Sequence, residues 1–375
     1  MDNKKSHSFL RNGVVQSVLA SVICIILGLL VGYIVLLIIN PSGAWTAITN
    51  ILKNYMYYPS AVKQKQYLGT TLVKTAPLLL CSLSVLFAYK VGLFNIGAAG
   101  QYVGGAGACL FFALALKAPW PVCVLAAIVV AAAMGAVTGV LKAYLNVSEV
   151  ISGIMLNWIS LYVVNMLLST QQDPSSPYSA KLSANNTSAL LPSLGLDKLF
   201  NNNSAVTIAL PLSVIVAIII WVLLEKTKLG YELKATGLNK DAAKYCGMRE
   251  KYNIILTMAI AGALGGLGAA FYYLTGVEQW SVTATSVPSM GFNGIAAGFL
   301  GGLNPIGAIF SSYFIQHITS GGSYVPNKMY PSQISDFISA LIIYLCGFVF
   351  FFKLWLNRML DKSDEKKLAK KGGNQ

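Results

Sequence analysis

The stretch VVQSVLASVICIILGLLVGYIVLLII, residues 14–39, contains no charged residue. A membrane-spanning helix needs about 20 mostly apolar residues, whereas the apolar region of a cleaved signal peptide has only about 7–15. Three basic residues, Lys4, Lys5 and Arg11, come before the stretch. These features predict an uncleaved first membrane span.

The composition of the whole chain supports a membrane protein. Of its 375 residues, 55% are hydrophobic and only 11% are charged, compared with about 25% charged residues in a soluble domain. So few charges cannot cover the surface of a soluble protein of this size. The same figures exclude a disordered chain, a collagen-like fibre and a disulfide scaffold.

Further apolar stretches predict an all-α, polytopic transmembrane bundle of about ten spans. The stretch 289–320 is uncharged but is interrupted by Gly301-Gly302 and Asn304-Pro305, so we expect two helices there, because proline and paired glycines interrupt a helix. The small-xxx-small spacing of several glycines predicts close helix packing. The expected spans are 14–39, 68–88, 95–116, 121–145, 150–168, 206–224, 252–275, two within 289–320, and 337–356.

The distribution of Lys and Arg predicts the orientation, because cytoplasmic loops carry an excess of both. Most of the 27 Lys and Arg residues fall on one side if the N-terminus is cytoplasmic. We therefore expect a multi-pass protein of the cell membrane with both termini in the cytoplasm. Residues 1–375 form a single transmembrane domain, with a cytoplasmic N-terminus at 1–13, a cytoplasmic loop at 225–251 and a basic cytoplasmic tail at 357–375.

The sequence offers no catalytic machinery. No glycine is followed by lysine, so there is no Walker A phosphate loop, and no Cys or His spacing predicts a metal site. We expect no catalytic residue, no cofactor, no metal and no nucleic-acid partner. Ion-coupled transporters usually carry ionisable groups inside the membrane, but the spans here carry uncharged polar residues, which suit a small neutral solute: Asn95, Gln101, Asn157, Asn165, Asn293, Asn304 and Gln316.

The polar loop 225–251 contains a short amphipathic helix. Asn239 is a suitable N-cap and Gly247 a suitable residue after the C-terminus. The residues Leu238, Ala242, Tyr245 and Cys246 follow an i, i+4, i+7, i+8 pattern, which gives one apolar face. A two-turn helix is not stable alone, so this face must pack either on the protein's own helix ends or in a groove of a partner. The residues themselves favour neither alternative.

Four segments resemble one family. They are GLFNIGAAGQ at 92–101, SEVISGIMLNW at 148–158, GLNKDAAKYCGM at 237–248 and GFNGIAAGFLGGLNPIGAIF at 291–310. Together they resemble the permease subunits of bacterial ABC importers in the branched-chain amino acid, simple sugar and nucleoside superfamily, and most of all the nucleoside (guanosine-type) permeases. The chain departs from this pattern at Ala99, where many relatives carry an acidic residue.

The resemblance implies an ATP-driven importer that translocates nucleosides. Its partners would be a cytoplasmic ABC ATPase subunit, an extracytoplasmic solute-binding (lipo)protein, a second permease chain that is related or identical, and the lipid bilayer. The match at 237–248 implies that the loop is the coupling helix that contacts the ATPase. The implied coupling residues are Gly237, Leu238, Asn239, Ala242, Ala243, Tyr245 and Gly247.

Other functions stay open. A simple-sugar permease for a ribose-like solute fits the polar lining equally well. A stand-alone secondary transporter or channel would need ionisable groups at mid-membrane, and an integral membrane enzyme would need a His, Asp and Glu constellation at a membrane face. Neither feature is present in the sequence.

An internal similarity predicts where the solute passes. The segment 92–97 opens the third span, and the similar segment 291–296 opens the eighth. If spans one to five and six to ten are copies, their odd number gives two inverted repeats of five, and such folds place interrupted helices beside the solute site. The expected pathway residues are Phe94, Asn95, Gln101, Asn157, Phe292 and Asn293.

Overall fold

The computed structural model describes residues 13–326, 328–331 and 334–372. The predicted N-terminal segment, apart from Gly13, and residues 373–375 of the predicted tail lie outside them. Within the described residues the chain is helical, with only isolated β-bridges between loop residues, so the all-α prediction is confirmed. The main helices are α2 (Gly13–Ile39), α3 (Ala44–Lys53), α4 (Ala61–Lys90), α5 (Ala98–Leu114), α6 (Trp120–Leu145), α7 (Glu149–Ser169), α10 (Ala209–Lys226), α11 (Lys228–Leu238), α12 (Lys240–Tyr245), α13 (Glu250–Tyr273), α14 (Met290–Leu300), α15 (Pro305–Gly321), α16 (Ile334–Cys346) and α17 (Val349–Gly372).

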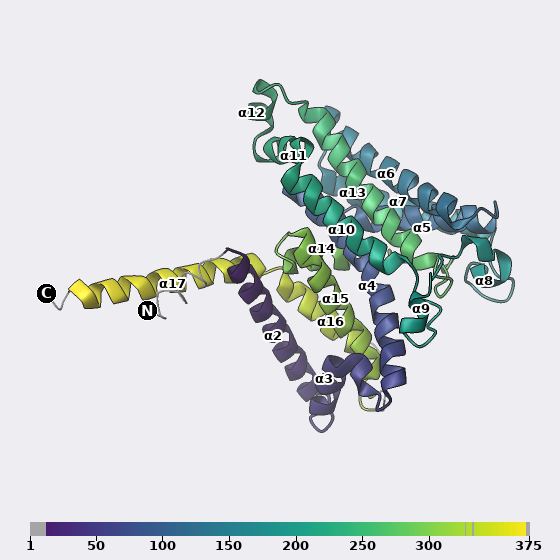
Figure 1. Cartoon of the computed structure of the whole chain (residues 1–375), viewed down its shortest axis with the longest axis horizontal. Helices are drawn as coiled ribbons and strands as arrows, with labels where there is room; N and C mark the ends of the chain where they lie inside the picture. Colours follow the sequence, from purple (N-terminus) through teal and green to yellow (C-terminus); the bar gives the residue numbers. More distant parts are fainter. Residues whose placement is uncertain (1–12, 327, 332–333, 373–375) are drawn as a thin grey trace.

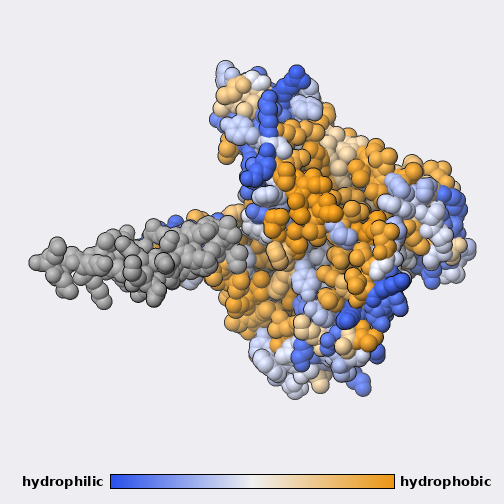
Figure 2. Space-filling view, viewed as in Figure 1, coloured by the Kyte–Doolittle hydropathy of each residue, from blue (hydrophilic) through white to orange (hydrophobic). Residues whose placement is uncertain are grey.

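Six of the described helices are long and apolar enough to cross a membrane, and they belong to α2, α4, α6, α7, α10 and α13. Two shorter apolar helices, α5 and α14, lie among them. Apolar side chains cover the middle of the molecule, and hydrophilic residues gather at its ends (Figure 2). The chain is thus a multi-pass membrane protein.

The break predicted within 289–320 is confirmed. Helix α14 ends at Leu300, and α15 begins at Pro305. Between them Gly302 and Leu303 have φ angles of +67° and +54°, which end the first helix. The side chain of Asn304 then accepts a hydrogen bond from the backbone N–H of Ile306 at 2.9 Å and caps the second helix.

The single last span predicted at 337–356 is wrong. Helix α16 ends at Cys346, and α17 begins at Val349 after a turn at Gly347 and Phe348. Glycine disfavours a helix interior because its backbone loses more entropy there. Helix α17 leaves the bundle and runs sideways from it (Figure 1). The apolar pattern continues through this turn, so hydrophobicity alone could not locate the break.

The helices pack most closely where glycines face a neighbouring backbone. A Cβ on Gly135 of α6 would collide with the carbonyl oxygen of Met258 on α13. From the other side, a Cβ on Gly262 or Gly266 would collide with the carbonyl oxygens of Ala131 and Ala127. Small residues permit this approach, as the glycine spacing predicted. We call this contact the α6–α13 seam.

Helices α11 and α12 stand at one end of the bundle, beyond the ends of α10 and α13 (Figure 1). Helix α3 lies at the opposite end, below α2 in the same view. The loop 225–251 and the 40–60 connection therefore lie at opposite ends of the bundle.

Candidate functional site: a polar junction inside the bundle and an exposed loop

The start of α5 is held by a buried amide pair. Asn95 donates through Nδ2 to Oε1 of Gln101 at 2.8 Å and to Oγ of Ser84 at 3.0 Å. Gln101 donates back through Nε2 to Oδ1 of Asn95 at 3.2 Å. Asn95 is completely buried and Gln101 is 2% exposed. The two amides therefore satisfy each other inside the protein, where an unpaired polar group would cost about 1–3 kcal/mol.

Asn157 connects α7 to the same place. Its Nδ2 donates to the carbonyl oxygen of Ile96 at 3.1 Å, and its Oδ1 accepts from the backbone N–H of Gly100 at 2.7 Å. A Cβ on Gly97 would lie 3.2 Å from Cα of Gly153 on α7. Three of the six predicted pathway residues, Asn95, Gln101 and Asn157, thus gather around the start of α5.

Helix α14 begins beside this junction. A Cβ on Gly291 would lie 2.6 Å from the backbone nitrogen of Ala99 and 2.9 Å from its Cβ. Ala99 is fully buried. The position of Ala99 is therefore closed by the backbone of α14.

The two predicted Phe-Asn pairs differ in their surroundings. Phe94 is half-buried, whereas Phe292 is 38% exposed. The side chain of Asn293 is half-buried and forms no hydrogen bond with the described residues, in contrast to Asn95. The second pair is consequently the more open of the two.

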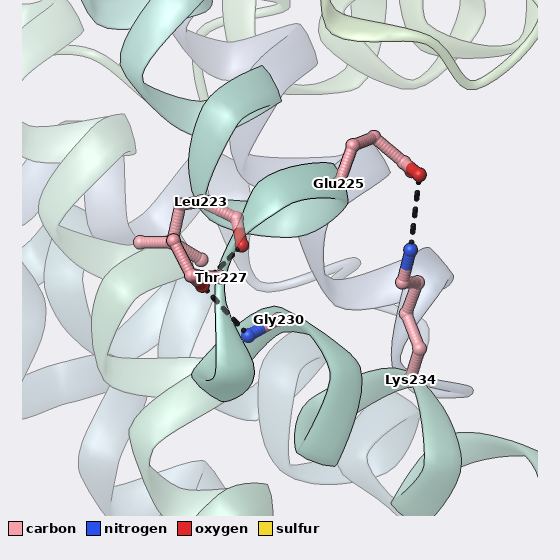
Figure 3. Close-up of polar contacts among 5 residues, drawn as sticks. All are labelled: Leu223, Glu225, Thr227, Gly230 and Lys234. Carbon is pink, nitrogen blue, oxygen red and sulfur yellow. Dashed lines mark hydrogen bonds and ion pairs between the residues drawn. The ribbon is translucent and has the colours of Figure 1, made fainter.

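At the end of the bundle, a rigid corner joins α10 to α11. Thr227 Oγ1 donates to the carbonyl oxygen of Leu223 at 2.6 Å and accepts from the N–H of Gly230 at 3.1 Å. Lys234 of α11 lies 3.1 Å from the carboxylate of Glu225 of α10. Figure 3 shows both contacts on either side of the turn. The corner fixes the direction in which α11 leaves the bundle.

The predicted caps of the next helix are confirmed. Oδ1 of Asn239 accepts hydrogen bonds from the N–H groups of Asp241 and Ala242, each at 3.0 Å. Gly247 has a φ angle of +80°, and the N–H of Met248 bonds to the carbonyl oxygen of Ala243 at 3.0 Å. Helix α12 is therefore defined at both ends.

The predicted apolar face of this loop is exposed. Leu238 is 89% exposed and Tyr245 is 93% exposed, and Ala242 and Cys246 are exposed as well. We call these four residues the loop apolar face. Ala243 points the other way and is only 4% exposed, so within this chain it is a packing residue. Of the two alternatives left open by the sequence, packing of this face on the protein's own helix ends does not occur among the described residues.

The end of α11 lies directly against the segment that leads to Asn95. A Cβ on Gly237 would collide with the carbonyl group of Val91 and would lie 2.8 Å from the nitrogen of Gly92. Next to it, Thr236 accepts a hydrogen bond from Nδ2 of Asn253 at 2.8 Å, and both residues are buried. This contact, which we call the 91–237 contact, was missed from the sequence. Gly237 was selected as a coupling residue, but the sequence carries no signal for a contact with residues 91 and 92.

An ion pair lies close to the same segment. Nζ of Lys142, at the end of α6, lies 2.9 Å from the carboxylate of Glu149, at the start of α7. The Glu149 carboxylate also interacts with the backbone of Phe94. Segment 91–97 is therefore held by α7, by α11 and by its own amide pair.

The described residues include no group of three or more His, Cys, Asp or Glu that could hold a metal ion. Their polar groups at the junction are amides, hydroxyls and backbone groups. Such groups can bind a neutral solute by hydrogen bonds, because amides and hydroxyls both donate and accept.

Known proteins resemble the chain along most of its length. Residues 67–347 match the family model described as branched-chain amino acid transport system / permease component. A nucleoside ABC transporter permease protein of Lactococcus lactis subsp. cremoris is 32% identical over 372 residues, which cover 96% of this chain and 99% of that relative. A guanosine ABC transporter permease protein of Bacillus subtilis is 31% identical over 332 residues, covering 87% and 91%.

A more distant relative is a glucose ABC transporter permease protein of Haloferax volcanii, which is 29% identical over 288 residues, or 74% of each chain. No solved structure matches the chain. The family match extends from the second turn of α4 to the turn after α16 and includes both the polar junction and the exposed loop. The chain therefore belongs to the family of permease components of branched-chain amino acid transport systems.

Proposed function

We propose that this protein is the membrane-spanning permease subunit of an ABC importer that carries nucleosides across the cell membrane. The observation that carries the proposal is the loop apolar face, which is exposed at one end of a bundle whose buried polar junction is uncharged. A stand-alone transporter would have no use for such a face. The two relatives above are named as nucleoside and guanosine permeases, and they suggest the solute class.

The proposal includes three protein partners. A cytoplasmic ABC ATPase docks on the loop apolar face and hydrolyses the ATP, because the chain has no phosphate loop of its own. An extracytoplasmic solute-binding lipoprotein delivers the solute at the opposite end, and a second permease chain completes the pathway. In this orientation both termini, the loop 225–251 and the tail 357–375 are cytoplasmic.

The proposed solute pathway passes the junction of α5 and α14. Both helices begin at the Gly291–Ala99 contact. Helix α5 runs parallel to α7, because Gly100 packs against Asn157 and Gly107 against Val164. Helix α14 runs parallel to α4, because Gly294 packs against Cys81, and Gly298 against Ser82 and Leu86. Since α4 and α7 cross the bundle in opposite directions, α5 and α14 do too. This arrangement supports about ten spans in two inverted repeats of five.

The solute class can be tested by uptake. A strain that lacks the gene is complemented with the chain and its partners, and uptake of labelled guanosine, uridine and ribose is compared. Restored guanosine or uridine uptake is the expected result. If only ribose uptake is restored, the sugar alternative replaces the nucleoside proposal. The glucose permease among the relatives supports keeping that alternative in the test.

The two asparagines should respond differently to alanine. Asn95→Ala removes both partners of the Gln101 amide and one partner of Ser84, so we expect lower thermal stability, by about 1–3 kcal/mol of unfolding free energy, together with lower uptake. Asn293→Ala breaks no hydrogen bond within the described residues and should lower uptake at unchanged stability. Thermal unfolding and uptake kinetics are measured on both variants. Normal uptake by Asn293→Ala would remove Asn293 from the pathway.

A charge at the outer end should affect delivery of the solute. Lys328 is exposed, whereas Glu278 is half-buried and accepts a hydrogen bond from the Tyr272 hydroxyl at 2.9 Å. Rim charges mainly set orientation and association rate. Lys328→Glu should therefore reduce uptake about threefold or more at low solute concentration and leave maximal uptake unchanged. Glu278→Lys removes the acceptor of the Tyr272 hydroxyl and should therefore lower uptake at every solute concentration. It serves as the comparison for a change that disturbs the local structure. Unchanged uptake by Lys328→Glu at low solute concentration would exclude Lys328 from the docking surface.

A further inference from the structure

A non-helical segment enters the bundle between α13 and α14. The residues SVTATSVPS, 281–289, connect these helices without forming a helix. At one end of the segment, the carbonyl oxygen of Ala284 accepts a hydrogen bond from Nδ2 of Asn165 at 2.8 Å. Just past the other end, the backbone of Gly291 packs against Ala99. The backbone N–H of the next residue, Gly100, donates to Oδ1 of Asn157.

The depth of this segment follows from α7. Asn165 and Asn157 both lie on α7, eight residues apart, which is about 12 Å along a helix at 1.5 Å per residue. Asn157 is close to the middle of α7, a candidate membrane span from Glu149 to Ser169. The chain therefore descends about 12 Å in a non-helical form and reaches the middle of the span before α14 begins.

Several polar groups of the segment have no hydrogen-bond partner among the described residues. Thr283, Thr285, Ser286 and Ser289 are all exposed. The hydroxyls of Thr285, Ser286 and Ser289 form no hydrogen bond with the described residues, and neither do the backbone N–H groups of Thr285, Ser286 and Val287. Non-helical backbone at membrane depth does not face lipid; it is buried in protein or lines a water-filled cavity. Exposure of these groups points to water.

Two aromatic rings lie at the same depth. Trp158 and Tyr162 of α7 are stacked, with ring centroids 6.3 Å apart and planes 25° apart, and they are 45% and 61% exposed. Trp158 comes seven residues before Asn165, so it lies on the same face of α7, two turns away. Lipid-exposed Trp and Tyr are enriched at the two membrane interfaces and not at mid-span. On α6, by contrast, the exposed residues at comparable depth are aliphatic, such as Leu125 and Val129.

We propose that residues 283–289 and the Trp158–Tyr162 pair line the water-filled route of the solute. The hydroxyls donate to and accept from the solute, and the rings offer a flat apolar face for stacking. A solute with both a ring face and several hydrogen-bonding groups fits this lining, and a nucleoside has both. The identity of the solute rests on the proposed function, whereas the contact with water does not.

Thiol labelling in the assembled transporter tests the contact with water. Ser286→Cys and Ser289→Cys are made in the otherwise native chain, and the label on each introduced cysteine is read separately by peptide mass spectrometry, so that labelling of exposed Cys246 does not contribute; Cys24, Cys81, Cys109 and Cys123 are buried. A charged, membrane-impermeant thiosulfonate reacts only with a thiol in water, because the thiolate is the nucleophile. The matched control is Val129→Cys, which is 56% exposed on α6.

We expect both cysteines to be labelled at least about tenfold faster than the control cysteine, because a thiolate forms in water but not in lipid. Saturating nucleoside should slow that labelling. Labelling as slow as at Val129→Cys would overturn the proposal, since the segment would then be covered by the second permease chain or by lipid. Fast labelling that no solute slows would overturn the contact with the solute. Protection by ribose and not by nucleosides would support the lining and overturn the proposed nucleoside solute.

Transport kinetics give a second measurement. Thr285→Val keeps the shape of the side chain and removes its hydroxyl, so we expect the KM for nucleoside uptake to rise about 2- to 10-fold, as for one lost hydrogen bond. Thr285→Ser should restore it. Trp158→Leu should raise the KM more than Trp158→Phe, which keeps a ring. Unchanged KM in both Thr285→Val and Trp158→Leu would contradict the proposal.

Discussion

Replacing Ala242 with glutamate should abolish solute uptake while the chain still inserts normally into the membrane. Ala242 lies in the loop apolar face between Leu238 and Tyr245, both almost fully exposed. If this face is covered by the ATPase, the new carboxylate is buried without a partner, which costs several kcal/mol. A loss of about 3 kcal/mol weakens association roughly 100-fold. Co-purification of the ATPase and solute uptake are the two measurements.

The matched control for this variant is Ala184→Glu. Ala184 is also exposed and also lies in a short helix, α8 (Leu182–Asn185), but at the far side of the bundle from α12 (Figure 1). This control should keep both ATPase association and uptake. If Ala242→Glu co-purifies its ATPase and transports like the control, the loop apolar face is not the ATPase contact.

Gly237→Ala should separate ATP hydrolysis from transport. Alanine is the better helix former by about 1 kcal/mol, so the substitution by itself stabilises α11. Its methyl group, however, would collide with the carbonyl group of Val91 and force the 91–237 contact apart. Because the loop apolar face is unchanged, we expect normal ATPase association, but uptake at least about tenfold lower, since overpacking costs about 1–3 kcal/mol. The number of solutes carried per ATP hydrolysed in proteoliposomes is the decisive measurement.

Gly298→Ala is the control for this second variant. A Cβ on Gly298 would meet its nearest neighbours, Ser82 and Leu86, at 3.5–3.7 Å, which is ordinary contact, so its transport ratio should stay normal. If Gly237→Ala also carries the normal number of solutes per ATP hydrolysed, movement of the loop does not reach segment 91–97 through Gly237. A lower ratio in Gly237→Ala alone would place the link there.

Local signals in the sequence predicted the parts of the fold that depend on neighbouring residues. Asn239 caps the start of α12 and Gly247 follows its end, as the cap preferences of these residues indicated. Asn304 and Pro305 begin α15 after the expected break. The turn at Gly347 was not predicted, because the apolar pattern runs through it without interruption. Hydrophobicity indicates where a chain can cross a membrane, but it does not determine where a helix turns aside.

The candidate site was only partly predictable for a different reason. Sequence reasoning selected Asn95, Gln101 and Asn157 by their polarity, and the structure brings them together. It could not predict that Asn95 and Gln101 bond to each other, because that depends on the shape of segment 91–97. Residues 281–289 have the Ser, Thr and Pro content of an external loop, and their place inside the bundle follows only from the contacts of Ala284 with Asn165 and of Gly291 with Ala99.

The α6–α13 seam limits which parts of the permease can move. Glycines on both helices touch the partner's backbone, so neither helix can slide past the other without breaking contacts over several turns. Packed helices of this kind are displaced together, as one rigid body. Helix α5 joins the same block, because a Cβ on its Gly105 would lie only 2.5 Å from Cα of Gly266 on α13. A rearrangement that opens the solute pathway would accordingly carry α5, α6 and α13 together.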